Sequence, residues 1–302
     1  MQNKKMSLLK ETEFPCYYID SDIASKKAQN IYKGFTWVSL SCMLLTTILV
    51  SLSSSVARYI PWFEKTNGII LFLSGLISIY LVISKPEKGW YLGRAIAESI
   101  KTLSWRYMMH ASPFESGDHN EDVKQFAERI SDINKQANKD KFIPKPNKNH
   151  SDVITPKMGE VNNLNFDERK SFYLKNRIAD QIKWYGDKSE LNRKKGNIYS
   201  WLMVGFQFIG GIYLFFFIDD FKLLNINNIM VFLATSIIAV VEMNKYKELH
   251  QSYAFTCKEL NIIKTKASIV NNDIDFQQFV IEAEQAISRE HTMWLARRGG
   301  LD

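Results

Sequence analysis

The sequence predicts an all-α membrane protein with two transmembrane helical hairpins, which supply four spans, and with long cytoplasmic helices. Three observations predict this fold class. Four stretches of 19 to 24 residues carry no formal charge, which is long enough for a helix to cross a hydrocarbon core of about 30 Å. These stretches are grouped in two close pairs. Elsewhere the chain shows no strand pattern of any length.

The four uncharged stretches are bounded by charged residues and predict spans at about 34–57, 66–84, 196–218 and 223–241. Backbone amides have no water to bond inside lipid, so uncharged segments of this length must be helical. The second stretch is apolar on every face, which argues against two buried helices in a soluble core. Because only a few residues join the members of each pair, each pair is predicted to be a hairpin.

The average composition conceals these spans. The mean hydropathy is −0.20 and 24% of the 302 residues are charged, as in a soluble protein. The two facts agree if about 80 residues lie in lipid and the remaining two-thirds are exposed to water. We therefore expect a large extramembrane part.

Basic residues predict the topology. Lys26, Lys27 and Lys33 precede the first span, and similar clusters follow the second, precede the third and follow the fourth, whereas the hairpin tips carry few basic residues. The positive-inside rule then places both termini and the long middle segment in the cytoplasm.

This arrangement and anionic lipid head groups account for the net charge of +7. Nucleic-acid binding is not expected, since it favours basic clusters interleaved with stacking aromatics.

The segments after the first hairpin are predicted to be helical until a linker begins. Residues 86–111 and about 118–138 carry apolar residues at helical spacing, and Asp118 is a plausible N-cap. Residues 139–166 contain three prolines and many Asn and Lys residues, a composition that predicts the linker between two halves.

The second half repeats this organisation. Helix is predicted from Asp167 towards the third span, then from the fourth span to about Lys266, and again after Asn272. The residues before the two hairpins also match: 26–32 read Lys-Lys-Ala-Gln-Asn-Ile-Tyr, and 194–199 read Lys-Lys-Gly-Asn-Ile-Tyr. A duplicated unit explains the match, so we expect two two-span domains in parallel orientation, at 20–138 and 167–298.

The residue types that perform catalysis are scattered, so neither an enzyme nor a cofactor is expected. The five histidines show no metal-binding spacing (His110, His119, His150, His250 and His291). Cys16, Cys42 and Cys257 include no close pair, so neither zinc nor a structural disulfide is expected. No catalytic, cofactor-binding or metal-binding residue is assigned.

Hydroxyl groups in the first span are the first candidate functional residues. Ser39, Thr46 and Ser53 recur every seven residues, with Thr47 and Ser54 on the next row. Seven residues advance a helix by nearly two turns, so these hydroxyls form a stripe. Such a stripe can pack against another helix, or line a weakly polar pore once several copies assemble.

The third span carries the other candidate. Gln207 lies there with Gly205, Gly210 and Gly211, a combination that favours a close-packing surface or a pore lining. No ionisable residue lies within any of the four spans. Ion-coupled transport is therefore not expected, because it uses such residues near the midplane.

Extended aromatic motifs outside the spans resemble a known family. They are residues 173–192, with Tyr173, Arg177 and Trp184-Tyr185; residues 90–107, with Trp90-Tyr91, Arg94, Glu98, Lys101 and Thr102; and the tail with Glu284, Ser288, Glu290-His291 and Trp294. The segment leading into the third span resembles the SLATT family, the SMODS- and SLOG-associating two-transmembrane effector domains of bacteria. The first half resembles a sister branch. The two copies cover nearly the whole chain except its first residues and the linker.

The resemblance implies an effector in bacterial conflict or antiphage defence. Such a protein is expected to lie in the bacterial inner membrane as a multi-pass protein, to form a homo-oligomer in the lipid bilayer, and to permeabilise the membrane when triggered. This chain has no nucleotide-binding glycine-rich loop, so the trigger is expected to act either through a partner protein linked to a nucleotide signal or through the helices themselves. The alternative is a membrane scaffold or sensor without a pore, which docks a partner through its cytoplasmic helices.

Overall fold

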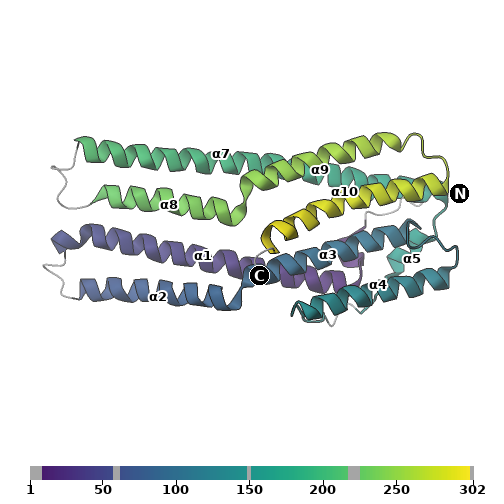
Figure 1. Cartoon of the computed structure of the whole chain (residues 1–302), viewed down its shortest axis with the longest axis horizontal. Coiled ribbons are helices and arrows are strands. Elements are labelled where there is room, and N and C mark those ends of the chain that lie inside the picture. The colour runs from purple at the N-terminus through teal and green to yellow at the C-terminus, as the bar shows by residue number, and fades with distance from the viewer. Residues whose placement is uncertain (1–8, 57–61, 148–150, 217–224, 300–302) are drawn as a thin grey trace. The chain divides into compact units, whose positions relative to one another are not determined.

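The computed structural model describes residues 9–56, 62–147, 151–216 and 225–299. Every regular element among them is helical (Figure 1): η1 (Glu11–Glu13), α1 (Cys16–Val56), α2 (Phe63–Ser84), α3 (Pro86–Met108), α4 (His119–Lys139), α5 (Pro156–Asn162), α6 (Phe166–Tyr173), the π-helical η2 (Leu174–Ile178), α7 (Ala179–Phe216), α8 (Ile226–Asn244), α9 (Tyr246–Lys266) and α10 (Asp273–Gly299). The predicted all-α class is confirmed.

Four helical stretches are long and apolar enough to cross a membrane, as predicted: Cys16–Leu52, Phe63–Met108, Phe166–Phe216 and Ile226–Lys266. In the most apolar 18-residue segment of each stretch, only 6 to 22% of the residues are buried within the protein. Side chains this apolar would be unfavourable in water, so a lipid environment explains their exposure. The ends of the predicted spans at residues 57, 217–218 and 223–224 lie outside the described residues.

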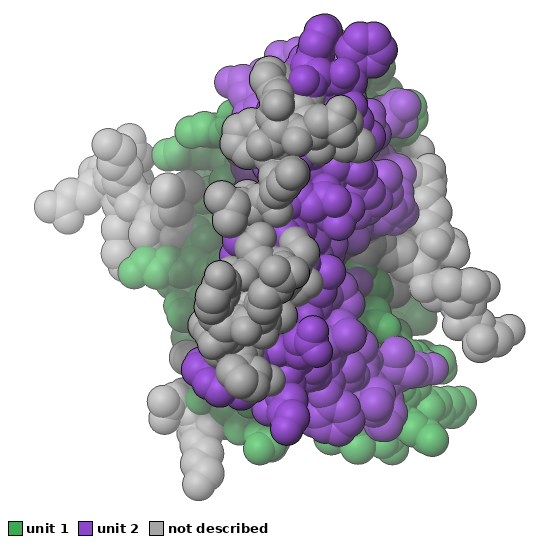
Figure 2. Space-filling view, turned by 90° about the vertical axis from the view of Figure 1, so that its left-hand side faces the viewer, with its two compact units in different colours: residues 1–29, 87–188, 252–302 green, residues 30–86, 189–251 purple. Residues whose placement is uncertain are grey.

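The described chain forms two compact units, which Figure 2 colours separately. Unit 1 comprises residues 1–29, 87–188 and 252–302, and unit 2 comprises residues 30–86 and 189–251. Each unit draws on both halves of the sequence. The division therefore separates the spans, in unit 2, from the other helical segments, in unit 1, and it falls within α1, α7 and α9.

Unit 2 contains the two helical hairpins. In the first, the Ser39 and Ser74 hydroxyls lie 3.0 Å apart and both side chains are buried between α1 and α2. In the second, a Cβ at Gly210 of α7 would lie 3.3 Å from Met230 Cβ of α8. Small residues let the paired helices approach closely at both contacts.

The second helix of each hairpin ends in the same way. Lys85 follows α2 and Lys245 follows α8, both in the left-handed conformation, with φ of 42° and 52°. Each backbone N–H donates to the carbonyl four residues earlier, at Leu81 and Val241, which satisfies one of the last carbonyls of the helix. The next helix begins at once, with Pro86 or Tyr246. This shared C-cap is structural support for the duplication that the sequence indicates.

Unit 1 holds the main hydrophobic core. Phe126 and Ile130 of α4, Tyr107 of α3 and Ile287 of α10 are among its fully or nearly fully buried residues. The predicted N-cap of α4 is confirmed, since the Asp118 carboxylate accepts a hydrogen bond from the Asn120 backbone N–H at 2.9 Å.

Part of the predicted linker is ordered in this core. The Thr155 hydroxyl caps α5, and Pro156 occupies its first turn, where the missing N–H is not needed. Met158 and Val161, three residues apart, are then fully buried. One of the prolines that indicate a break in the helices, Pro156, therefore also marks the start of a short helix.

Candidate functional site

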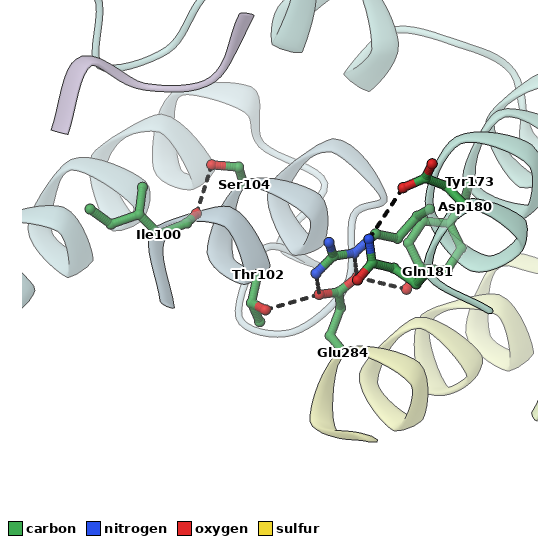
Figure 3. Close-up of polar contacts among 8 residues, drawn as sticks. Ile100, Thr102, Ser104, Tyr173, Asp180, Gln181 and Glu284 are labelled. Atoms are coloured by element: carbon green, nitrogen blue, oxygen red, sulfur yellow. Dashed lines mark hydrogen bonds and ion pairs between the residues drawn. The ribbon is translucent and has the colours of Figure 1, made fainter. Parts of the chain in front are cut away.

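A buried carboxylate lies at the centre of unit 1. Glu284 of α10 is completely buried, and its two oxygens accept four hydrogen bonds (Figure 3). Arg177 donates from Nε at 2.9 Å and from Nη2 at 2.7 Å, Tyr173 donates from its hydroxyl at 2.9 Å, and Thr102 donates from its hydroxyl at 3.0 Å. We call these four residues the Glu284 network. Every lone-pair direction of the carboxylate is therefore used.

Three segments of helix supply the partners of Glu284. Thr102 lies on α3, Tyr173 ends α6, and Arg177 lies in the π-helical turn η2. Tyr173 and Arg177 are four residues apart, which places both side chains on one face towards α10. Insertions of π-helix are rare and frequently occur at functional sites. Because Arg177 lies in this turn, it is a candidate functional residue.

An aromatic ring lies against the Arg177 side chain. Its guanidinium lies 5.8 Å from the centroid of the Trp105 ring, a cation–π distance. Trp105 meets the ring of Tyr173 edge to face, with centroids 5.6 Å apart. Exclusion of water strengthens the attraction between Arg177 and Glu284, and it makes the loss of either partner costly.

The surroundings alter the acid–base properties of the network. Burial, together with the negative charge of Glu284, raises the pKa of Tyr173 well above its ordinary value of 10.0. Burial alone would lower the pKa of Arg177, but the negative charge of Glu284 has the larger effect, so the arginine pKa is raised. The tyrosine therefore stays a neutral donor and the arginine stays charged at physiological pH.

A second charged cluster lies on α3. Arg94 and Glu98 form an ion pair at 2.8 Å, and Glu98 is buried. The Lys101 ammonium lies 5.4 Å from the ring centroid of Phe14 and 5.5 Å from that of Tyr18. Burial lowers the pKa of Lys101 from its ordinary value of 10.5. Lys101 of α3 thus contacts Phe14 and Tyr18 of the N-terminal segment at cation–π distances.

The Glu284 network can fix the packing of its helical segments, because a buried, bidentate ion pair is costly to break. It leaves no carboxylate oxygen free to bind a metal or a substrate. Among the residues that the structure describes, no group of three or more His, Cys, Asp or Glu side chains could hold a metal ion.

Comparison with known families matches both halves of the chain. Residues 15–170 match the SMODS and SLOG-associating 2TM effector domain 3 (SLATT 3), and residues 173–294 match the SMODS and SLOG-associating 2TM effector domain 1 (SLATT 1). The chain belongs to the SLATT family. Neither a curated protein nor a solved structure matches it.

The Glu284 network joins the two SLATT copies. Thr102 belongs to the first copy, and Tyr173, Arg177 and Glu284 belong to the second. All four residues lie in motifs that carry the resemblance in the sequence. The sequence interpretation missed their role, because it treated the motifs as diffuse packing patterns.

The sequence nevertheless contains a pattern that indicates burial of Glu284. It lies four residues after Val280 and three before Ile287, on the apolar face of the last helix. A lone carboxylate on an apolar face requires a buried partner. The sequence could not identify Arg177 as that partner, since 107 residues separate the two.

The predicted span residues occupy different environments. Ser39 contacts Ser74 and lies between α1 and α2. The Thr47 hydroxyl donates to the Met43 carbonyl of its own helix at 2.9 Å, and the buried Thr46 hydroxyl has no partner among the described residues. Ser53 and Ser54 lie in α1, but their side chains lie outside the described part of the structure.

Gln207 and its neighbouring glycines do not form one contact surface. Gln207 is exposed, Gly210 packs against α8, and a Cβ at Gly205 or Gly211 would meet nothing within 4 Å. The structure therefore brings Ser39 into a hairpin contact but leaves Gln207 on an open face of α7.

Proposed function

We propose that this SLATT protein is a multi-pass effector of the bacterial inner membrane, with both termini in the cytoplasm, which acts in conflict or antiphage defence without catalysing a reaction. When triggered, its copies assemble and permeabilise the membrane. The observation that carries the proposal is the tandem pair of two-transmembrane effector domains, together with four helices suited to a bilayer. The uncharged spans favour leakage over coupled transport.

Unit 1 is proposed as the part that receives the trigger, through a partner protein linked to a nucleotide signal. The Glu284 network supports this assignment, because it joins both SLATT copies and lies wholly within unit 1. Breaking the network would change the packing of α3 against α10, and both helices belong to that unit.

Induced expression in bacteria with a membrane-potential dye tests the proposed function. We expect the potential to collapse once the trigger is present. Stable potential and normal growth, in triggered cells that contain well-inserted protein, would overturn the proposal.

Substitution of Thr46 and Ser53 by Leu tests the pore wall: leakage is abolished if these hydroxyls face the pore and persists if they only pack. Thr235→Leu on α8 is the matched control, an exposed threonine bonded within its own helix.

A scaffold that docks a partner without forming a pore is the second candidate. Phe255 and Ile262 of α9 favour it, since these large apolar side chains of unit 1 are 56% and 66% exposed. A scaffold would leave the membrane potential unchanged while binding its partner, so the same dye measurement separates the two functions.

A further inference from the structure

Gln207 of α7 occupies an unusual position for a carboxamide. It lies midway between Lys195 and Asp219, the charged residues that bound the third span, and therefore near the bilayer midplane. Its side chain is exposed, and it makes no hydrogen bond to the residues that the structure describes. A carboxamide without a partner is unfavourable in hydrocarbon, because lipid tails supply neither donors nor acceptors.

The face around Gln207 is shaped to admit another helix. Gly211 follows one turn later, and a shallow groove forms over both residues with Phe208, Ile212 and Phe215 at its sides. A Cβ at Gly211 would meet nothing within 4 Å, so the backbone there is open to close approach. The hairpin partner α8 does not cover this face, since it packs at Gly210. We call this surface the Gln207 face.

The chemistry of the amide favours one occupant. A carboxamide carries both a donor and an acceptor, so two glutamines at the same depth satisfy each other. Two copies of this chain insert with the same topology, which places their α7 helices parallel and brings Gln207 of one copy to the level of Gln207 of the other. A two-fold axis along the membrane normal then makes the contact self-complementary.

We propose that the Gln207 face is the surface at which two copies of this chain associate in the membrane, with the two Gln207 side chains paired and the Gly211 backbones in contact. The inference rests on the assembly proposed above and names the residues that mediate it.

Disulfide crosslinking in native membranes tests the contact directly. We expect Gln207→Cys to give an oxidised dimer above the background of the wild-type chain, which retains Cys16, Cys42 and Cys257. Ile209→Cys is the matched control, because Ile209 is 50% exposed at nearly the same depth but points about 160° away from Gln207 around the helix. Two outcomes would overturn the proposal: equal crosslinking at both positions, or labelling of the thiol introduced by Gln207→Cys with a membrane-impermeant reagent in the absence of a dimer.

Energy transfer between two differently labelled copies in vesicles measures the affinity. We expect Gln207→Leu to weaken association about three- to twentyfold, the range for interhelical hydrogen bonds in membranes, and Gln207→Asn to retain most of it. Gly211→Leu should also weaken association, whereas Gly205→Leu should not, because Gly205 lies about 120° from Gly211 around the helix and faces open space. Wild-type affinity in both Gln207→Leu and Gly211→Leu would refute the Gln207 face.

Membrane potential recorded in the same cells separates the two proposals. A Gln207→Cys dimer without triggered leakage would retain the interface and reject the pore. Leakage that survives in Gln207→Leu, together with no dimer in Gln207→Cys, would retain the pore and reject the Gln207 face.

Discussion

Thr102 donates a hydrogen bond to Glu284 across 182 residues of sequence. The bond joins the first SLATT copy to the second. It is the fourth hydrogen bond to the Glu284 carboxylate, which also accepts three from Arg177 and Tyr173. The two copies therefore share one core in unit 1, in place of two separate ones. Its stability should depend on residues from both copies.

Glu284→Gln is expected to destabilise the protein by about 3–5 kcal/mol, because it leaves the Arg177 charge buried without its counter-charge. Thermal unfolding of the purified protein in detergent, followed by loss of the monodisperse species, measures the effect. Glu282→Gln on the same helix is the control, since Glu282 pairs with Lys266 near the surface and should contribute no more than about 1 kcal/mol.

A double variant separates the ion pair from the general cost of substitution. Arg177→Met combined with Glu284→Leu removes both charges and keeps apolar volume, so it should destabilise much less than the sum of the two single variants. Additive losses would instead mean that the two side chains act independently. That outcome would contradict a bidentate pair in a closed site.

Thr102→Val should destabilise by about 1–2 kcal/mol, because it removes one donor to a charged acceptor and keeps the shape of the side chain. Thr265→Val on α9 is the matched control: the Thr265 hydroxyl bonds only to the Asn261 carbonyl of its own helix and is exposed. Unfolding temperatures of the two variants, compared side by side, test whether the contact between SLATT copies contributes. Equal, small effects would argue against it.

Glycines on α3 supply a test of packing within unit 1. A Cβ at Gly93 would lie 2.9 Å from Ser25 Cβ and 3.0 Å from the Ser21 carbonyl oxygen, so Gly93→Ala should cost about 1–3 kcal/mol. At Gly89 the nearest atom is Ala28 Cβ at 3.6 Å, an ordinary contact. Gly89→Ala should therefore be neutral or stabilising by up to about 1 kcal/mol, as expected for alanine in a helix. Loss of folded protein in both variants would contradict this packing.

The sequence predicted those parts of the fold that depend on local physical chemistry. Spans follow from charge spacing, and the start of α4 follows from the Asp118 side chain. The Glu284 network depends on tertiary pairing: no local pattern brings Thr102 of the first copy to Glu284 of the second. The π-helical turn at Arg177 was also beyond prediction, because a change of hydrogen-bond register leaves almost no mark on apolar periodicity. The exposure of Gln207 required the hairpin partner α8 to be placed first.

The stability of unit 1 should fall as the pH drops below about 6.5, in part through His110. Burial, reinforced by the positive charge of Arg169, lowers the pKa of His110 below its ordinary value of 6.5, although Asn162 and Asp122 oppose the shift. The unfolded chain therefore binds the proton first, so folding stability is lost as the pH falls from 6.5 towards the folded-state pKa. His110→Asn removes this titration and suits the backbone, since His110 has a φ of 54° and asparagine tolerates that region. Unfolding temperatures recorded from about pH 7.5 to about pH 5 should decline less steeply in His110→Asn than in the wild type or in the exposed-histidine control His119→Asn. Parallel curves for all three proteins would show that His110 does not contribute.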